Sequence, residues 1–395
     1  MRIAGLFAGI GGFELGMHRA GHETELLCDV LPASKAVLQA RFPGVEYRDD
    51  ITKLRSLPRS VDVVCAGFPC QDLSQAGRTA GLEGERSGLI GEVFRLLSRR
   101  RVPTVIVENV PFMLQLNGGL AMRAIVEEFE RRGYRWAYRV VDTLSFGLPQ
   151  RRERVFLVAS RVVDPADVLL ADDQPIERPR SAIGVRAHGF YWTEGLGGLG
   201  WAPDAVPTLK NGSTIGIPSP PAVLMPDGRV IKPDIRDGER LQGFDPDWTE
   251  PAERVARGSI RWSLVGSAVS VPVAYWVGRR LSSPGCYLSE RETEFPVIGK
   301  LPKAARYDGR KRFSVSVSAD PCGIRAPALT EFLTDADGQQ LLSLKATRGF
   351  LERTRRAKLR FEPGFIAAVE RHLVSMGGEV PAPARVDPQL ELLAA

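Results

Sequence analysis

The sequence contains 395 residues, of which 44% are hydrophobic and 25% are charged. At roughly 150 residues per domain this length predicts two to three domains, and the composition excludes wholesale disorder. The net charge of +6 fits either a nucleic-acid partner or simply a basic enzyme. The apolar runs are too short to cross a membrane, and no secretory cleavage site follows the first of them. We therefore expect a cytoplasmic protein without a membrane partner.

The cysteines and histidines show no pattern that would hold a metal. The sequence has 5 Cys and 4 His, scattered along the chain. An odd number of cysteines does not make a disulfide scaffold, and no Cys-x-x-Cys or zinc-like histidine spacing occurs in the sequence. We expect no metal site.

Short apolar runs alternate with amphipathic stretches over residues 1–160, which is typical of strands and helices in a parallel sheet. Right-handed connections predict an α/β fold with a doubly wound, mostly parallel sheet and helices on both faces. The predicted strands are residues 2–7, 25–28, 61–66, 104–107, 138–142 and 155–159. The predicted helices are residues 13–20, 33–42, 89–100 and 122–132.

The character of the sequence changes after residue 163. Residues 164–235 are rich in Pro, Gly and Asp and predict a smaller, loop-rich, partly β region. Order returns at residues 236–244 and in an apolar helix predicted at 271–281, which would pack back on the sheet. Residues 282–395 form a further basic, mixed extension.

The first predicted strand leads into Phe7-Ala8-Gly9-Ile10-Gly11-Gly12, and a predicted helix follows. Glycines at such a turn let a ligand approach the backbone closely. Asp29 ends the next strand, where a carboxylate can hold ribose hydroxyls, and a second acid follows in Asp49-Asp50-Ile51. The pattern indicates a nucleotide-like cofactor, unless the glycines only make an ordinary turn. Because the full dinucleotide fingerprint is missing, the spacing disfavours NAD and leaves adenosine-type cofactors open.

Two chemically versatile residues follow other predicted strands. Cys70, in Gly67-Phe68-Pro69-Cys70-Gln71, is either an exposed nucleophile or a small buried residue. Glu108, in Glu108-Asn109-Val110-Pro111, either caps a turn or acts as an acid or hydrogen-bond clamp. Because the carboxyl ends of neighbouring strands meet at one edge, Cys70 and Glu108 would converge on one small ring. The segment Gln150-Arg151-Arg152-Glu153-Arg154 predicts, by itself, only a solvated charge run.

Taken in order, these motifs resemble those of the bacterial-type DNA cytosine-5 methyltransferases. Arg240-Leu241-Gln242-Gly243-Phe244 and Gly266-Ser267-Ala268-Val269 are similar to the last two motifs of that family, so the resemblance covers residues 1–160 and 236–281. It implies a Rossmann-like, S-adenosylmethionine-dependent methyltransferase fold. The implied regions are a catalytic and cofactor-binding domain at 1–163, a target-recognition region at 164–235, a return to the catalytic domain at 236–281 and a C-terminal extension at 282–395.

The resemblance implies an enzyme that transfers a methyl group from S-adenosylmethionine to C5 of a cytosine flipped out of double-stranded DNA, through a covalent bond between Cys70 and C6. Glu108 would hold N3 and the exocyclic amine, Arg154 would contact O2, and Arg152 would support the site. The glycine-containing loop 75–86 would close over the base. Carried over residue by residue, the implied cofactor-binding positions are Phe7, Gly9, Gly11, Asp29, Val30, Asp50, Ile51, Pro69, Leu89, Ser267 and Val269.

The chain departs from the family pattern in several places. Ser267 stands where the family has Asn, which exchanges an amide donor and acceptor for a shorter hydroxyl and predicts weaker cofactor binding. The family normally ends soon after the 271–281 helix, whereas this chain continues. Residues 345–360 of the extension are rich in Lys and Arg, which predicts either a solvated helix face or a helix that contacts DNA phosphates beside the 164–235 region. Glu239 and Arg240 are expected to form an internal ion pair.

Other functions stay open on the sequence alone. A tRNA cytosine-5 methyltransferase is disfavoured by the long extra region and by the absence of that branch's Cys-Phe-Thr signature from the sequence. A catalytically silent, sequence-specific DNA-binding protein is disfavoured by the intact Cys70, Glu108 and Arg154 set. A nicotinamide oxidoreductase would leave Pro69-Cys70-Gln71 without a role.

The same resemblance bears on partners and location. It implies a restriction-modification system with a cognate restriction endonuclease acting at the same site, and a bacterial enzyme that associates with the nucleoid when bound to DNA. We expect a monomer, because flipping a single base requires no two-fold axis.

Overall fold

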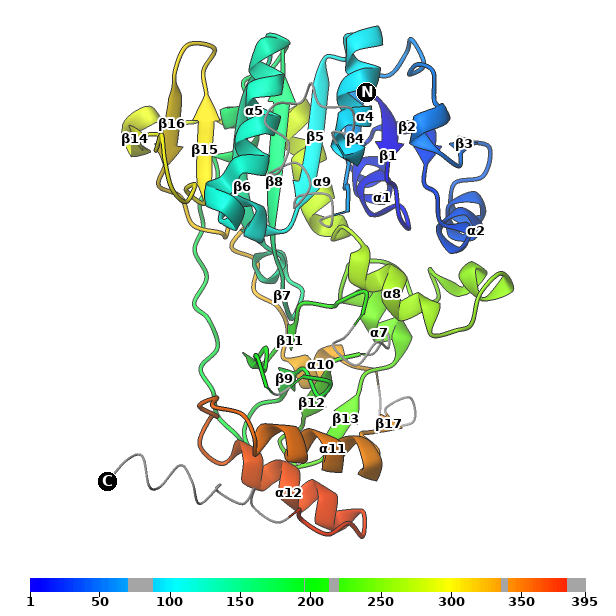
Figure 1. Cartoon of the computed structure of the whole chain (residues 1–395), viewed down its shortest axis with the longest axis vertical. Coiled ribbons are helices and arrows are strands. Elements are labelled where there is room, and N and C mark those ends of the chain that lie inside the picture. Colours follow the sequence, from blue (N-terminus) through cyan, green and yellow to red (C-terminus); the bar gives the residue numbers. More distant parts are fainter. Residues whose placement is uncertain (70–87, 195, 213–219, 335–339, 382–395) are drawn as a thin grey trace.

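The computed structural model describes residues 1–69, 88–194, 196–212, 220–334 and 340–381, which form two lobes (Figure 1). The upper lobe in Figure 1 is built on a ten-stranded sheet, and the lower lobe contains a five-stranded sheet. Cys70 and the loop 75–86 lie outside the described residues. No helix in the described ranges is long and apolar enough to cross a membrane.

The large sheet combines strands from distant parts of the chain. In spatial order the strands are β14 (Glu292–Glu294), β16 (Arg312–Val315), β15 (Ala304–Tyr307), β6 (Arg135–Asp142), β8 (Glu153–Ser160), β5 (Thr104–Asn109), β4 (Val63–Ala66), β1 (Arg2–Leu6), β2 (Glu23–Cys28) and β3 (Glu46–Arg48). The pairings from β5 to β3 are all parallel, whereas β8 runs antiparallel to β5 and β6. The carboxyl ends of β1, β4, β5 and β6 therefore share one edge, which we call the carboxyl rim.

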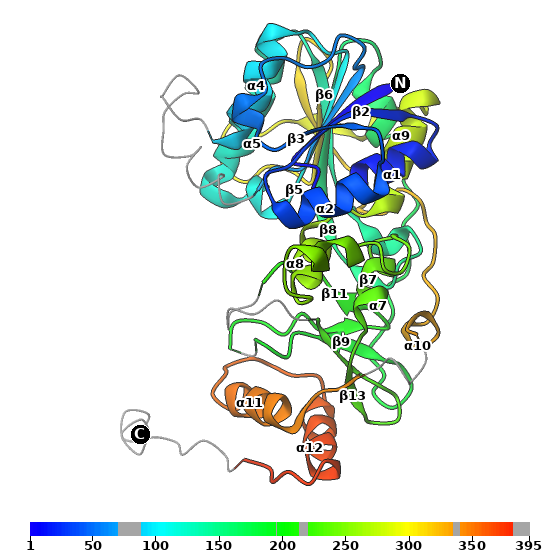
Figure 2. The same ribbon diagram turned by 90° about the vertical axis from the view of Figure 1, so that its right-hand side faces the viewer.

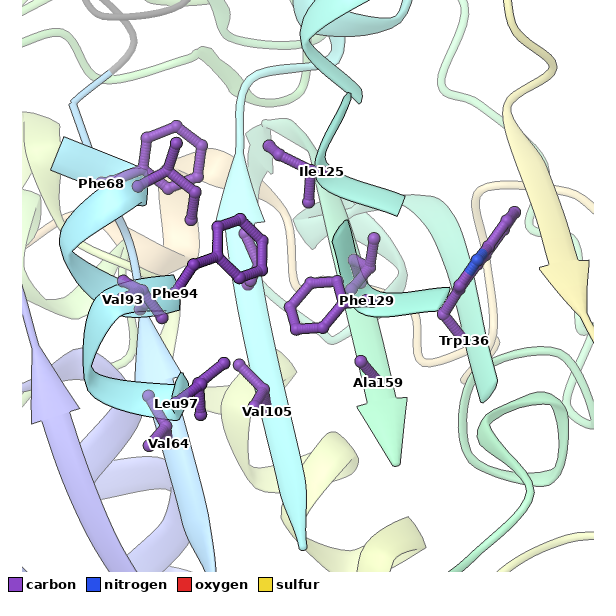
Figure 3. Packing of buried hydrophobic residues seen from close by; sticks show 14 of the residues in the cluster. Val64, Phe68, Val93, Phe94, Leu97, Val105, Ile125, Phe129, Trp136 and Ala159 are labelled. Carbon is purple, nitrogen blue, oxygen red and sulfur yellow. The ribbon is translucent and has the colours of Figure 1, made fainter. Parts of the chain in front are cut away.

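Helices cover both faces of this sheet (Figure 2). On one face α4 (Leu89–Arg99) and α5 (Leu120–Arg131) pack over β4 and β5, with Phe94 and Phe129 in edge-to-face contact at 5.1 Å (Figure 3). Each such aromatic ring, when fully buried, stabilises the fold by roughly 1.5–3 kcal/mol. The opposite face carries α1 (Gly12–Arg19), α6 (Pro165–Leu169) and α9 (Val271–Ser282). The helix α2 (Pro32–Arg41) lies toward the second lobe.

Two glycines allow α1 and α9 to approach closely. A Cβ atom on Gly12 would lie 2.2 Å from the carbonyl oxygen of Val269, and one on Gly16 would lie 2.5 Å from Cβ of Ala274. Any larger residue at either position would separate the helices. The segment after residue 268 thus packs directly on the first helix of the chain.

The second lobe has its own sheet and core. Its strands, in order, are β10 (Ala202–Pro203), β9 (His188–Phe190), β12 (Ala222–Leu224), β13 (Val230–Lys232) and β17 (Gln340–Leu341). Phe190 of this sheet packs against Phe350 of α11 (Leu344–Thr354) and Phe365 of α12 (Phe365–Ser375), with ring centroids 5.2 and 5.0 Å apart. The opposite face contacts α7 (Ile235–Arg240), α8 (Ile260–Ser267) and α10 (Leu329–Phe332). A short parallel pair, β7 (Gln150–Arg151) with β11 (Val206–Pro207), links the lobes.

The doubly wound, mostly parallel sheet is confirmed, and the strands and helices predicted within residues 1–160 all occur, with ends shifted by at most three residues. The extension differs from the expected single appendage. Its strands β14, β15 and β16 extend the large sheet, whereas β17, α11 and α12 belong to the second lobe. Pairing of β15 with β6 covers an edge that would otherwise expose unpaired backbone groups.

The predicted ion pair between Glu239 and Arg240 is wrong. Glu239 pairs with Arg261 at 3.0 Å, and Arg240 pairs with Asp237 at 3.1 Å. Residues adjacent in a helix point in different directions, so Arg240 cannot face its neighbour, whereas Asp237 lies one turn earlier.

Candidate active site

The glycine-containing turn after β1 has an unusual backbone. Phe7, Gly9 and Gly11 all adopt positive φ angles, of 57°, 58° and 84°. A positive φ angle is sterically unfavourable for Phe7, and such strained residues are found most often in functional turns. A Cβ atom on Gly9 would meet no atom of the described residues within 4 Å, so these residues leave the space above the turn open. The turn leaves room for a ligand against the backbone.

Asp29, at the end of β2, shapes this turn. Its Oδ2 accepts a 2.8 Å hydrogen bond from the backbone amide of Gly9, and its Oδ1 accepts one of 2.9 Å from Leu31. Burial raises the pKa of Asp29, and these hydrogen bonds oppose that rise. Val30, beside it, is exposed and presents an apolar surface next to the carboxylate. The pair offers an acceptor for hydroxyl groups and an apolar wall.

Asp50 and Ile51 lie at the start of the short helix η1 (Ile51–Lys53). The carboxylate of Asp50 accepts a 2.7 Å bond from the hydroxyl of Thr52 and caps that helix by accepting a 2.9 Å bond from the amide of Thr52. The hydroxyl bond first, and then the amide bond, lower the pKa of Asp50. Ile51 is buried in the core. Asp50 therefore fixes the backbone at the start of η1.

Glu108 is buried at the carboxyl end of β5, with 7% of its surface exposed. Its Oε1 lies 3.1 Å from Nε of Arg154. Burial raises the pKa of Glu108, although the charges of Arg154 and Arg152 oppose the rise. A Cβ atom on Gly67 would lie 3.6 Å from Oε2 of Glu108, so the strand that leads toward Cys70 passes next to this carboxyl group.

Asn109 links the segment that leads toward Cys70 to β5 through a hydrogen bond. Its Nδ2 donates a 3.0 Å hydrogen bond to the carbonyl of Phe68, and its Oδ1 accepts one of 2.8 Å from the amide of Val110. The backbone two residues before Cys70 is thus fixed to the residue that follows Glu108. Pro69 is the last described residue before Cys70. Leu89 begins α4 and is half-buried.

Arg152 is buried and bonded to backbone oxygens. Its guanidinium donates to the carbonyls of Leu209 at 3.0 Å, Ala268 at 2.6 Å and Gly266 at 3.3 Å. These acceptors come from the second lobe and from the segment that returns to the large sheet. The side chain therefore joins two stretches of backbone, one at Leu209 and one at residues 266–268.

Residues 266–269, which form the last of the motifs, lie beside the turn and the segment that leads toward Cys70. Val269 is buried, its carbonyl packs on Gly12, and its Cγ2 would lie 3.8 Å from a Cβ atom on Gly67. Ser267, at the end of α8, is exposed. Val269 thus lies between the glycine-containing turn and the strand that leads to Cys70.

Sequence reasoning missed the residues around Tyr191 in the second lobe. The hydroxyl of Tyr191 donates a 2.7 Å bond to the carbonyl of Thr208, and Nζ of Lys210 lies 3.8 Å from the centre of its ring. Gly266 packs against the backbone of Lys210, because a Cβ atom there would lie 2.2 Å from its carbonyl. The only signal was Pro207-Thr208-Leu209-Lys210-Asn211-Gly212, which predicts a turn and nothing more.

Comparison with known proteins places these motifs in a family. The sequence model described as "C-5 cytosine-specific DNA methylase" matches residues 1–182. The chain is 46% identical over 385 residues to the Type II methyltransferase M2.BsuMI of Bacillus subtilis, a match that covers 94% of this chain and 98% of that protein. It is 33% identical to M.NgoBI of Neisseria gonorrhoeae, over 68% of this chain and 89% of that protein.

Other matches have lower sequence identity. The match to M.MspI of a Moraxella species, at 34% identity, covers 39% of this chain and 37% of that protein. A solved structure of a putative prophage DNA modification methyltransferase from E. coli is 18% identical, with a TM-score of 0.46, and covers 72% of this chain and 99% of its own. The match to M2.BsuMI spans nearly the full length of both chains. This chain belongs to the bacterial-type DNA cytosine-5 methyltransferase family.

Proposed function

We propose that this chain methylates C5 of a cytosine that has been flipped out of double-stranded DNA, with Cys70 as nucleophile and S-adenosylmethionine as methyl donor. The observation that carries the proposal is the buried Glu108–Arg154 pair beside Gly67, on the strand that leads to Cys70. A flipped base is the only form of cytosine whose C6 a side chain can reach, since the ring is covered on both faces within a duplex.

The first chemical step is attack of the Cys70 thiolate on C6, which forms a sulfur–carbon bond and moves the electrons of the ring double bond toward N3 and O2. Glu108 supplies the proton at N3. Burial raises its pKa, so its protonated form is easier to populate than that of an exposed carboxyl group. Arg154 holds Glu108 in place and offers positive charge near O2.

Activation of the ring makes C5 nucleophilic. S-adenosylmethionine supplies the methyl group that C5 takes up. A solvent base then takes the proton from C5, and the freed electrons restore the C5–C6 double bond as the bond between sulfur and C6 breaks. The sulfur leaves as the thiolate of Cys70, and N3 returns its proton to Glu108. These steps require Cys70 to lie at C6 of the ring, while Glu108 lies at N3 and Arg154 near O2.

The residues around the glycine-containing turn fit the donor. The open space above Gly9 accepts the methionine part, Asp29 accepts bonds from ribose hydroxyls, and Val30 lies against the adenine. The remaining positions proposed to line this pocket are Phe7, Gly11, Asp50, Ile51, Pro69, Leu89, Ser267 and Val269. Ser267 is exposed, so its hydroxyl is free to face solvent or ligand.

Arg152 is proposed as a positioning residue. Its bonds to Leu209, Gly266 and Ala268 hold the segment that carries Val269 against the turn. The charge of Arg152 also lowers the pKa of Glu108, but its hydrogen bonds go to protein backbone.

The second lobe is proposed to read the DNA sequence. We assign target recognition to residues 164–235, the return to the catalytic domain to 236–281 and DNA contact to the second half of the extension. On α11 the side chains of Lys345 and Arg348 are exposed. Arg353, by contrast, donates to the carbonyls of Trp192 and Glu194, so it serves the fold.

The relatives carry the name Type II methyltransferase, which supports a role in a restriction-modification system with an endonuclease of the same specificity. Acting on one base at a time, the enzyme works as a monomer. Its place of action is the bacterial cytoplasm, at the nucleoid.

Trapping on DNA that contains 5-fluorocytosine tests the proposal. Fluorine at C5 cannot leave as a cation, so with S-adenosylmethionine the wild-type protein should form a covalent complex that survives denaturing electrophoresis. We expect Cys70→Ser to abolish the complex and Glu108→Gln to slow its formation at least tenfold. Glu153→Gln, one position from Arg154 and half-exposed, is the matched control and should trap like wild type.

The alternatives give different results. DNA binding without a trapped complex would indicate a silent DNA-binding protein. Methylation of tRNA with no reaction on DNA would indicate the tRNA branch. Trapping through a residue other than Cys70 would contradict the proposed mechanism.

A further inference from the structure

The loop between β14 and β15 presents two apolar side chains to solvent. Val297 is 82% exposed and Ile298 is 88% exposed, more than any other large hydrophobic side chain of the described residues. We call these two residues the apolar tip. Both are β-branched and therefore stiff, and two adjacent stiff apolar side chains are costly to leave in water unless something covers them.

The backbone on both sides of the apolar tip is fixed by Arg123 of α5. Its guanidinium donates to the carbonyl of Pro296 at 2.9 Å and to that of Gly299 at 3.2 Å, so it bridges the two ends of the tip. The same group lies 5.6 Å from the centre of the Phe295 ring, which is itself buried. The tip is therefore held in one conformation by its base.

The loop is also joined to the carboxyl rim. The amide of Leu301 donates a 3.1 Å bond to the carbonyl of Leu114, and the Leu301 side chain packs against Gly119. Leu114 ends the short helix η3 (Pro111–Leu114), which begins just after Glu108–Asn109. Phe112 of the same short helix is exposed. The apolar tip thus lies along the edge of the sheet that carries the catalytic carboxyl group.

The charge around the tip favours a polyanion. Residues 296–303 contain two lysines and no acidic residue. Lys300 is exposed next to the tip, whereas Lys303 is paired with Glu153 at 3.1 Å. Apolar side chains flanked by cations are the means by which many proteins enter a DNA groove, where the side chain packs on sugars or between bases and the cation meets phosphate. A protein partner would require a broader apolar surface than two side chains.

We propose that the loop 295–301 contacts the duplex beside the flipped cytosine, with Val297 and Ile298 in the groove and Lys300 at a phosphate. This inference goes beyond the methyl-transfer chemistry and rests only on DNA being the substrate. It assigns the first half of the extension a role in holding flanking DNA, while the second half belongs to the recognition lobe.

The test compares Val297→Ser/Ile298→Ser with wild type on two duplexes that contain the sequence recovered by 5-fluorocytosine trapping. The short duplex contains the target sequence alone, and the long duplex adds flanks on both sides. We expect the double variant to bind the long duplex about tenfold more weakly, measured by fluorescence anisotropy, and to bind the short duplex like wild type. Methylation of the short duplex should be unchanged.

Val162→Ser is the matched control. Val162 is 67% exposed and follows β8 at the opposite end of the sheet, because Ser160 pairs with Thr104 at the start of β5. It should bind both duplexes like wild type. A further readout is 2-aminopurine placed in each flank, whose fluorescence should change on binding of wild type and not of the double variant.

Equal affinity of wild type and the double variant for the long duplex would overturn the proposal. So would a changed sedimentation coefficient of the free double variant, since that would assign the tip to contact between copies of the chain. If trapping recovered no sequence, the proposed function would fail, while anisotropy on a short and a long duplex of arbitrary sequence would still report on the loop.

Discussion

Glu14 is a carboxyl group inside the apolar core beneath the glycine-containing turn. It is 1% exposed, and neither of its oxygens has a hydrogen-bond partner in another of the residues that the structure describes. Its carboxyl group fills the space beside Gly5 of β1, where a Cβ atom would lie 1.9 Å from Oε1. Burial raises the pKa of Glu14 to about 8, and the charge of Asp29 acts in the same direction. Glu14 is therefore protonated in the folded protein at neutral pH.

This proton links stability to pH. The unfolded chain releases it near 4.5 and the folded protein near 8, so the folded state binds an extra proton between these values. The stabilising contribution is complete below 4.5 and is lost as the pH rises to 8. We predict that from pH 6 to pH 8 the free energy of unfolding of wild type falls by about 2 kcal/mol more than that of Glu14→Gln.

Urea unfolding of both proteins at the two pH values measures the difference. All other titrating groups are present in both proteins, so their contributions cancel when the change in the free energy of unfolding with pH is compared between wild type and Glu14→Gln. An equal change in the free energy of unfolding with pH in both proteins would mean that Glu14 is ionised in the folded state.

At the scale of elements, β8 and the residues just before it contain two arginines with different surroundings, for which we propose different roles. Arg152 bonds three backbone carbonyls, whereas Arg154 faces Glu108. We predict that Arg152→Met lowers the free energy of unfolding by about 3 kcal/mol, because buried acceptors lose their donor. Arg154→Gln should leave that energy within about 1 kcal/mol of wild type but slow covalent trapping by about 10- to 100-fold.

Thermal unfolding and 5-fluorocytosine trapping, run on both variants, give the comparison. Arg151→Gln, on the exposed position between Gln150 and Arg152, serves as control for substitution in this segment. A stable Arg152→Met protein with slow trapping would assign the chemistry to Arg152.

The elements that carry the site were predictable because of how parallel strands are buried. β1, β4 and β5 are covered on both faces, so they appear in the sequence as short continuous apolar runs, and the residues at the end of each run or just after it mark the carboxyl rim. Glu108 was located in this way. The supporting role of Arg152 was expected only from the family resemblance, since a basic run by itself gives no sign of which guanidinium turns inward.

The pairing of β15 with β6 could not be predicted either. The segment 304–307 is short and has a mixed composition, and a local hydrophobic pattern does not indicate which strand elsewhere in the chain it will pair with. The division of the extension between two lobes follows from that pairing. Long-range contacts of this kind depend on which edge stays uncovered once the first half of the chain has folded.

At the scale of the whole molecule, the lobes are joined where two connections cross. One is the link from the large sheet, which contains Arg178, and the other is the segment 316–328 between β16 and α10. Arg178 lies 3.2 Å from the carboxylate of Asp142 at the end of β6 and 2.6 Å from that of Asp320 in the second connection. Burial raises the pKa of Asp142, and the charge of Arg178 opposes that rise. One cation thus holds both connections against the carboxyl rim.

We predict that Arg178→Gln weakens the coupling of the lobes. Two buried carboxylates would lose their cation, at a cost of about 1–3 kcal/mol, which is less than for a fully buried pair because Arg178 is partly exposed. Scanning calorimetry should show a lower midpoint and a transition that broadens or splits, while limited proteolysis should cut residues 171–187 faster. Arg180→Gln, an exposed arginine two positions further along, should leave both unchanged. In the proposed function the flipped base is held between the two lobes, and the second lobe reads the DNA sequence. Uncoupling the lobes should therefore weaken discrimination between target and non-target DNA more than it slows trapping on the target. Equal losses in both would show that Arg178 serves stability alone.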